Sequence, residues 1–458
     1  MSAFIRTTSL LLLLASVSFT ATAREVQWVF NPALGEADSS PAVADMNGDG
    51  KDDMVVTTTA GMTNMVDNAG HLVWMSGVQI PISTTPTLVD LLEDPTPEVL
   101  VVNQSGRLYC LSGRSGDSIW QYELPGKIQW GMTAIAASDL DGDGTTEVIV
   151  GDDSGHVVCL SNEGELIWQY TGTHGYAYCP AIGIVGDNKA PAVLISGENE
   201  PLICLNADGS VRWRVEKTGD GSSPVIADLD GDGKNEIVTA LDNAVILVDG
   251  NGKVLWTYDT SNHFDSSLIV ADADEDGESE IYGVNLSGLV ISLDPKGAKR
   301  WSANVRERVR RSPAVADITG DGKLEVIVAG YSSEIFLFSG DGELKESLSM
   351  EQTTNGAPTI ADLDGDGTPY LLYVASSGNI LCYKWPEAKP NAKVVWPEYR
   401  FSSERRGTYQ ATHSSSVHIA DIDFGDLYAG TNTFSLALDN PDAVELKLEI
   451  TIEQTGKK

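Results

Sequence analysis

Short apolar segments alternate with turns rich in Gly and Asp along most of the chain, and together they form a recurring unit. In SSPVIADLDGDGKNEIV, for example, one apolar segment ends before Asp228 and the next begins after Glu236. Related segments place their first acidic position at residues 45, 90, 139, 184, 228, 272, 317 and 362, where position 184 is Ile. Eight copies spaced by 44 to 49 residues indicate an architecture of stacked supersecondary units.

A second pair of apolar segments completes each unit, with a Gly-containing turn followed by a segment that carries Trp, as in EGELIW and NGKVLW. The Trp residues fall at positions 28, 74, 120, 168, 213, 256 and 301, and Glu346 takes this place in the eighth copy of the motif. Each unit therefore contains about four short strands, without helical periodicity, which is the pattern of a propeller blade. We predict an all-β fold, an eight-bladed β-propeller with seven blades as the alternative, in which the Trp residues pack between blades.

The first Trp segment, EVQWVF at residues 25–30, precedes the first acidic turn. We expect it to pair with the last strands of the repeat region, near residues 379–384, so that the two ends close the ring. A closed ring removes the exposed edges that an open row of blades would leave at its ends.

The repeats resemble two known kinds of propeller. PAVADMNGDGKDDMVV and its siblings resemble the FG-GAP or VCBS-type repeats of integrin α-chain propellers and bacterial surface proteins, and Gly356-Ala357-Pro358 is retained in the last copy. The CLSxxGxxxW half is similar to the repeat of quinoprotein-type propellers, which include the outer-membrane assembly lipoprotein. The resemblance covers residues 28–385 and implies the propeller fold, which hosts many functions. We consider a quinoprotein dehydrogenase less favoured, because eight near-equivalent units provide no dedicated cofactor floor.

The two ends of the chain differ from the repeats. Residues 1–23 have an apolar run around Leu10 to Leu14 and an Ala-Thr-Ala end, which predicts a secretory signal peptide. The propeller is expected over 24–410, where VVWPEYRFSSERRGTY at 394–409 either packs on the ring or supplies an alternative closing strand. Residues 411–458 alternate apolar and polar positions and resemble the opening of hydin-like immunoglobulin-type domains, which implies a short, partial immunoglobulin-like β segment.

The charge balance excludes some partners. The formal net charge is -36, which disfavours nucleic acid and anionic membranes, and no segment after the signal approaches 18 uninterrupted apolar residues. We therefore expect a protein without membrane insertion that is secreted, displayed at the cell surface or periplasmic. Four of the five Cys residues occupy similar apolar segments, which favours buried thiols over a disulfide framework.

The acidic turns share one register. Counted from the first acid, oxygen-bearing side chains stand at positions 0, 2 and 4, Gly at 5 and another acid at 8. Such spacing suits Ca²⁺, which takes six to eight oxygen ligands from a tight loop. Solvated acidic turns are the alternative interpretation, although they would not require the repeated register. The predicted calcium ligands of the complete copies are Asp45, Asn47, Asp49 and Asp53; Asp139, Asp141, Asp143 and Glu147; Asp228, Asp230, Asp232 and Glu236; and Asp272, Asp274, Asp276 and Glu280.

The other four copies depart from this register. The copy at 317 has Thr at position 2, and the copy at 362 has Tyr370 in place of the last acid. The copy at 90 keeps Asp90, Asp94 and Glu98 but has Leu92 and two prolines within the turn, and the copy at 184 retains almost none of the ligand positions, so we predict no ion at either. The further predicted ligands are Asp317, Thr319, Asp321 and Glu325, and Asp362, Asp364 and Asp366.

No catalytic constellation is visible in the sequence. The six His residues show no metalloprotease spacing, and no nucleophile elbow or phosphate loop is present. The connections between each Trp segment and the next acidic unit vary between copies and should gather at one end of the ring. The residue types that they offer suit an acidic glycan or peptide, and the candidate ligand-binding residues are Trp130, His174, Tyr176, Tyr178, His263, Arg308, Arg310 and Arg311.

We therefore predict a calcium-stabilised propeller that acts as a binding or adhesion scaffold for a protein or glycan ligand. Alternatively, the Arg residues balance neighbouring acids and the Tyr residues pack in the channel. A polysaccharide lyase, or another carbohydrate-active enzyme on a propeller fold, would use the same residue types, with Tyr or His as the base and Arg neutralising a uronate. A deep pocket that places His or Tyr within about 4 Å of Arg would favour the enzyme.

Overall fold

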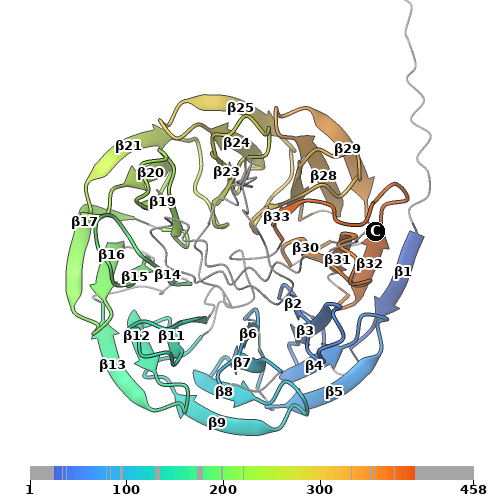
Figure 1. Ribbon diagram of the computed structural model, residues 1–458, viewed down its shortest axis with the longest axis horizontal. Helices are drawn as coiled ribbons and strands as arrows, with labels where there is room; N and C mark the ends of the chain where they lie inside the picture. The colour runs from blue at the N-terminus through green and yellow to red at the C-terminus, as the bar shows by residue number, and fades with distance from the viewer. Residues whose placement is uncertain are drawn as a thin grey trace, which may run out of the picture. The chain divides into compact units, whose positions relative to one another are not determined.

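The computed structural model describes residues 25–397, apart from 33–34, 38, 79, 83, 93–95, 129–134, 173–178, 198–199, 220, 332, 351–352, 355 and 376. Within this part of the chain, eight antiparallel sheets are arranged in a ring about a common axis (Figure 1). The fold is an all-β, eight-bladed β-propeller, which confirms the prediction and excludes the seven-bladed alternative.

The first four blades each contain four strands in sequential order. Blade one comprises β2 (Ala42–Ala44), β3 (Asp53–Thr57), β4 (Met62–Val66) and β5 (Leu72–Gly77). Blade two comprises β6 (Thr87–Val89), β7 (Glu98–Val102), β8 (Arg107–Leu111) and β9 (Ser118–Glu123). Blade three comprises β10 (Ala136–Ser138), β11 (Glu147–Gly151), β12 (His156–Leu160) and β13 (Leu166–Thr171). Blade four comprises β14 (Ala181–Gly183), β15 (Ala192–Ile195), β16 (Glu200–Asn206) and β17 (Val211–Gly219).

The remaining blades follow the same order, with additions at the end of the ring. Blade five comprises β18 (Val225–Ala227), β19 (Glu236–Leu241), β20 (Ala244–Val248) and β21 (Val254–Asp259). Blade six comprises β22 (Ile269–Ala271), β23 (Glu280–Val284), β24 (Leu289–Leu293) and β25 (Lys299–Asn304). Blade seven comprises β26 (Ala314–Ala316), β27 (Glu325–Ala329), β28 (Glu334–Ser339), β29 (Leu344–Ser349) and β33 (Val394–Trp396). Blade eight comprises β30 (Thr359–Ala361), β31 (Tyr370–Val374), β32 (Ile380–Lys384) and β1 (Glu25–Phe30).

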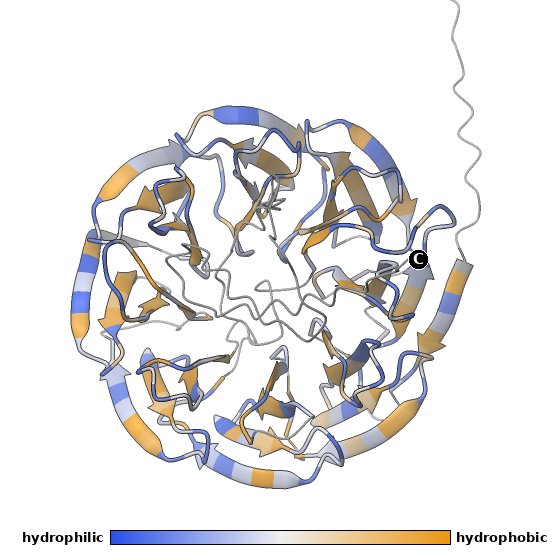
Figure 2. Ribbon diagram, viewed as in Figure 1, coloured by the Kyte–Doolittle hydropathy of each residue, from blue (hydrophilic) through white to orange (hydrophobic). Residues whose placement is uncertain are grey.

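Burial differs between the strands of a blade in a way that the sequence pattern explains. Every residue of β11, EVIVG, is buried, because the middle strands are covered by the neighbouring blades on both faces. The outermost strands alternate, as in β21, where exposed and partly buried residues take turns. Figure 2 shows the result on the rim, where apolar and polar stretches follow one another along the outer strands.

The Trp residues join neighbouring blades, as their register predicts. The indole nitrogen of Trp213 donates a hydrogen bond of 2.9 Å to the carbonyl of Gly250 in the next blade. Gly252 of that turn has a φ of +85°, and a Cβ on it would lie 2.7 Å from the Trp213 ring. The same bond recurs from Trp28, Trp74, Trp120, Trp168, Trp256 and Trp301. The Trp residues are therefore structural contacts between blades.

The ring closes as the sequence predicts. β1 pairs with β32 in antiparallel register, with Phe30 opposite Ile380, so the first strand forms the outer edge of the last blade. Blade eight also contacts blade one through Asp52, whose carboxylate accepts a hydrogen bond of 2.7 Å from the backbone of Asp362.

The segment after β32 contacts the acidic loops of blades seven and eight and then adds a strand to blade seven. The backbone of Asn391 donates a hydrogen bond of 2.8 Å to the carbonyl of Asp366, and Lys389 contacts the carbonyl of Gly320. β33 then pairs antiparallel with β26, the innermost strand of blade seven. Trp396 is fully buried there. Residues 394–396 thus pack on the ring as an added strand at the inner edge of blade seven, and residues 398–409 of the segment lie outside the described residues.

Other expectations concern the chain ends. The expected signal peptide at 1–23 and the expected immunoglobulin-like segment at 411–458 lie outside the described residues. Within the described ranges no helix has the length and apolar character needed to cross a membrane. All five Cys residues are buried and none forms a disulfide, which agrees with the sequence-based expectation.

Candidate functional site

The acidic loops and the variable connections lie at opposite ends of the ring. Each acidic loop joins the innermost strand of a blade to the second strand and touches the turn between the third and fourth strands, as where Asp53 accepts a hydrogen bond of 3.1 Å from the backbone of Asn68. The variable connections instead touch the turn between the second and third strands, as where Gly172 donates to the carbonyl of Gly155 at 2.9 Å. We name these ends the acid-loop face and the variable-loop face.

In six of the loops the first acid accepts hydrogen bonds from the backbone of its own loop. Asp228 accepts hydrogen bonds from Gly231 at 2.8 Å and from Gly233 at 3.0 Å, one on each carboxylate oxygen. Both glycines have positive φ values, 75° and 85°, which explains the Gly positions in the motif. Asp45, Asp139 and Asp362 make the same pair of bonds.

The last acid of each loop has a structural task that the sequence did not reveal. One oxygen of Glu147 accepts a hydrogen bond of 2.7 Å from the backbone of Leu140, seven residues earlier. The equivalent acid makes this bond in blades one, two, five, six and seven. Glu98 of blade two also makes it, although Leu92 and two prolines interrupt that loop, so this acid braces the loop even where the register is incomplete.

Burial makes the last acids unusual in their ionisation. Burial raises the pKa of Glu236 to about 7 and that of Glu325 to about 7, with neighbouring Asp carboxylates adding to the rise. Such a shift means that a negative charge in the loop is poorly solvated. A cation between these carboxylates would favour their charged form.

Carboxylates converge in four of the acidic loops that the structure describes. Ligand atoms of three acids lie within 4.8 Å of one another in blades three, five, six and seven, which is close enough to hold a metal ion. The converging acids are Asp139, Asp141 and Glu147; Asp228, Asp230 and Asp232; Asp272, Asp274 and Asp276; and Asp317, Asp321 and Glu325.

Some predicted calcium ligands form hydrogen bonds with other groups of their own loops. The amide nitrogen of Asn47 donates a hydrogen bond of 3.1 Å to Asp53. Asp143 accepts a bond of 2.7 Å from the backbone of Thr145, and the hydroxyl of Thr319 donates to Glu325 at 3.0 Å. In blade seven, one oxygen of the buried Asp317 has no hydrogen-bond partner among the described residues, and it is available to a ligand.

Blade six contains a cation of its own. The guanidinium of Arg300, on the outer strand β25, lies 2.6 Å from an oxygen of Asp274 and 2.7 Å from one of Asp276. In blade eight, the ammonium of Lys384 lies 3.1 Å from Asp364 and donates a hydrogen bond of 2.7 Å to the hydroxyl of Tyr370. Neither residue could be predicted from the sequence, because nothing in the spacing of the loops indicates a side chain from another strand.

On the variable-loop face, two of the predicted side chains form a group with Asp265. The imidazole of His263 lies 3.0 Å from one oxygen of Asp265, and the guanidinium of Arg310 lies 3.8 Å from the other. Arg308 is exposed, and its carbonyl accepts a backbone hydrogen bond of 2.8 Å from Tyr331. Arg311 is partly buried. The other predicted ligand-binding residues, Trp130, His174, Tyr176 and Tyr178, lie outside the described residues.

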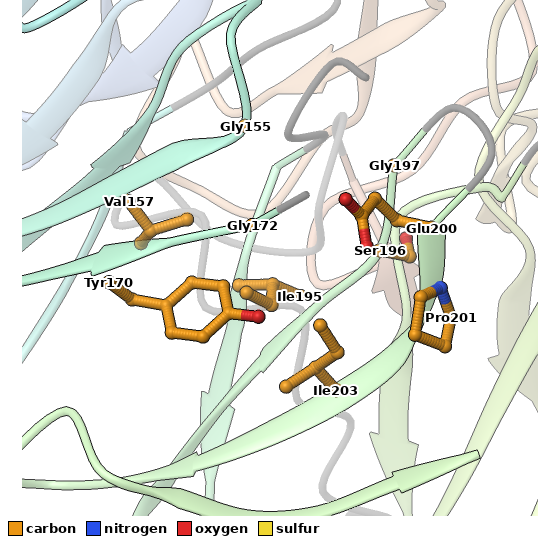
Figure 3. A pocket seen from close by; sticks show the side chains of 10 residues that line it. All are labelled: Gly155, Val157, Tyr170, Gly172, Ile195, Ser196, Gly197, Glu200, Pro201 and Ile203. Atoms are coloured by element: carbon orange, nitrogen blue, oxygen red, sulfur yellow. The ribbon is translucent and has the colours of Figure 1, made fainter. Parts of the chain in front are cut away.

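A pocket lies between blades three and four, beside the variable-loop face (Figure 3). Tyr170 stands on one side, and Glu200 and Pro201 stand on the other. The guanidinium of Arg214 donates a hydrogen bond of 3.2 Å to the hydroxyl of Tyr170. Burial raises the pKa of Tyr170, although Arg214 opposes the rise, so this hydroxyl retains its proton and is a poor general base. The proximity of Tyr to Arg therefore gives little support to a lyase at this position.

Comparison with known proteins identifies the repeat. Residues 17–176 and 154–384 match the family described as outer membrane protein assembly factor BamB. The chain belongs to this family. The match supports the quinoprotein-like half of the expected resemblance, whereas the FG-GAP or VCBS type of the acidic loops stays a prediction. No curated protein sequence matches the chain.

Solved structures agree on the propeller. BamB from Moraxella catarrhalis is 16% identical, with a TM-score of 0.55 over 78% of this chain and 98% of that one. Sqt1 from Saccharomyces cerevisiae is 10% identical, with a TM-score of 0.59 over 80% and 100%. The computationally designed Ika8 protein is 15% identical, with a TM-score of 0.57 over 78% and 99%. At these identities the similarity shows the fold alone.

Proposed function

We propose that this member of the BamB family is an exported, calcium-stabilised scaffold that binds a protein partner through its variable-loop face. The observation that carries the proposal is the separation of the two faces. On the acid-loop face the acidic side chains form hydrogen bonds within their own loops. On the variable-loop face the exposed His and Arg side chains differ from blade to blade. Ligand specificity usually resides in such variable loops on a rigid framework.

The charge of the variable-loop face favours an acidic partner. The chain is acidic, with a net charge of -36, yet the connection before blade seven carries four Arg residues between 306 and 311. Asp265 holds His263 and Arg310 in place, and both side chains keep 41% and 50% of their surface exposed. Guanidinium groups bind carboxylates with two parallel hydrogen bonds, so acidic side chains of a protein suit this surface.

The family description supports protein as the ligand class and the cell envelope as the location. An outer membrane protein assembly factor works among other proteins. Adhesion and glycan binding are finer alternatives for the same surface, because a uronate presents the same carboxylate chemistry. A polysaccharide lyase stays the alternative function in which the protein is an enzyme.

Calcium is the proposed ion of the acid-loop face. Blades three, five and seven each bring three carboxylates together, and all donors are hard oxygen atoms. Ca²⁺ accepts such irregular oxygen shells, whereas Mg²⁺ requires a near-ideal octahedron. The unpartnered oxygen of Asp317 in a buried setting is the observation in blade seven that points to an ion.

Binding to defined acidic probes tests the proposal. A labelled poly-glutamate peptide and polygalacturonate should both be compared on wild type and on the double variant Arg308→Gln/Arg310→Gln. We expect the double variant to bind the peptide at least about tenfold more weakly, which corresponds to about 1.4 kcal/mol. The matched control Lys253→Gln/Lys299→Gln makes the same charge change away from the variable-loop face and should keep the affinity. Equal loss in both variants would contradict the proposal, and release of unsaturated products from polygalacturonate would favour the lyase.

A further inference from the structure

The acidic loop of blade six is built around a cation that the protein supplies. The guanidinium of Arg300 is within 2.6 Å of Asp274, 2.7 Å of Asp276 and 3.6 Å of Glu280. A fourth acid, Glu278, lies 3.5 Å away. One side chain therefore faces acids at positions 2, 4 and 8 of the loop, which are the positions that would ligate an ion.

The buried acids of this loop show where the positive charge is needed. Glu280 is fully buried, and one of its oxygens has no hydrogen-bond partner among the described residues. One oxygen of Asp272 is in the same situation. The nearest cation to that Glu280 oxygen is the Nε atom of Arg300, at 3.6 Å. Buried carboxylates without a positive partner are costly, so a positive charge from Arg300 or from an ion stabilises the ionised form of this loop.

The same position differs between blades. In blade four it is Arg212, whose Nε donates a hydrogen bond of 2.7 Å to Asn206, but the loop of that blade has no acid at its ligand positions. Arg300 directly precedes Trp301, and the residues directly before the equivalent Trp are Val73, Ile167 and Leu255 in blades one, three and five. These aliphatic side chains are 54%, 53% and 45% exposed. In blade seven the equivalent residue is Lys345, whose ammonium pairs with Glu343 at 2.8 Å. Among these blades, a side chain from the outer strand enters the acidic loop only in blade six.

We infer that Arg300 replaces the metal ion in blade six, so that this loop takes no calcium while Arg300 is present and becomes a calcium site when Arg300 is removed. The inference rests on the proposed calcium chemistry of the other loops. Two cations cannot share one set of three carboxylates, because at a few ångströms their repulsion amounts to several kcal/mol even with the screening typical of a protein surface. Because the Arg is covalently attached, it also has no entropy of association to overcome, unlike a free ion.

The acidic loop of blade eight also has a positively charged side chain beside it, Lys384. Tyr370 replaces the last acid, and the ammonium of Lys384 lies 3.1 Å from Asp364 and 4.7 Å from the centre of the Tyr370 ring. The loop of blade eight thus lacks the last acidic ligand, and the ammonium of Lys384 lies beside the predicted ligand Asp364. Built-in cations in blades six and eight would leave calcium to the other loops.

Counting bound calcium tests the inference. Wild type and Arg300→Gln, both stripped with chelator and then equilibrated with radioactive calcium, should differ by one ion per chain, with the variant binding more. Lys299→Gln is the matched control, because it removes the neighbouring positive charge on β25, whose ammonium lies 3.4 Å from the Ser302 hydroxyl. Its count should equal that of wild type. An Arg300→Gln variant that is folded and binds no additional ion overturns the inference.

A second pair of variants keeps the test independent of the stability of Arg300→Gln. Asp274→Asn in blade six should leave the calcium count of wild type unchanged, whereas Asp230→Asn in blade five should lower it by one. A lower count for Asp274→Asn shows that blade six binds calcium in the presence of Arg300 and overturns the inference. A wild type that binds no calcium overturns the proposed calcium role instead, and the difference between wild type and Arg300→Gln still decides the inference.

Discussion

Removal of a single indole should weaken the junction between two blades far more than removal of its neighbour. Trp74 of blade one is only 8% exposed, packs on Gly116 of blade two and donates a hydrogen bond of 2.6 Å to the carbonyl of Gly113. Replacing such a buried Trp by Ala removes the packed ring and leaves a cavity, which costs about 3 to 5 kcal/mol. Trp74→Phe keeps most of the ring and loses the hydrogen bond, which costs about 1 kcal/mol before any repacking.

The control for this prediction lies one residue earlier on the same strand. Val73 is 54% exposed, so Val73→Ala should change the free energy of unfolding by less than about 0.5 kcal/mol. Urea unfolding followed by far-ultraviolet circular dichroism measures all three variants without relying on Trp fluorescence. The reasoning fails if Trp74→Ala costs less than about 1 kcal/mol, or if Val73→Ala costs as much as Trp74→Ala.

Three further predictions follow from the loops and turns. Chelation with EDTA should lower the melting temperature and added calcium should restore it, and an unchanged melting temperature would remove the calcium proposal. Burial raises the pKa of Glu236 and of Glu325 to about 7, above the ordinary value of 4.5, so the folded state binds more protons between these values. The calcium-free protein should therefore become more stable as the pH falls from about 7.5 to about 5.5, while the stabilisation by calcium becomes smaller. A lower melting temperature in EDTA at the acidic pH would contradict this. Gly252→Ala forces a Cβ to 2.7 Å from the Trp213 ring at a φ of +85° and should cost more than about 1 kcal/mol in urea unfolding. Gly231→Ala, with a φ of +75° and open space around its Cβ, should cost less, and equal losses would show that packing on Trp213 contributes nothing.

The sequence was sufficient for the fold because each blade repeats the same local signals. The Trp register placed one indole on each of seven outer strands, and the pairing of 25–30 with 379–384 followed from the order of the segments. The repeat also placed the acids in loops. The convergence of carboxylates in four described loops agrees with that register, although the ion itself stays a proposal.

The parts that the sequence did not reveal depend on contacts between strands. Arg300 enters the blade-six loop from an outer strand 26 residues beyond Asp274, and the spacing within the loop carries no trace of it. The brace from Glu98 to the backbone of Leu91 needs only one acid, so it is preserved in a loop whose register is interrupted by Leu92. β33 joins β26 through backbone hydrogen bonds, which leave little mark on the side chains of VVW.

Hydrogen exchange measured by mass spectrometry, with calcium and with the poly-glutamate peptide added separately, tests the division between the two faces most directly. Calcium should slow exchange in the acidic loops at 139–147, 228–236 and 317–325 and leave the connections at 260–268 and 305–313 unchanged. The peptide should protect those connections and leave the acidic loops unchanged. Protection of the acidic loops by the peptide, or no protection by calcium in any of them, would contradict the account.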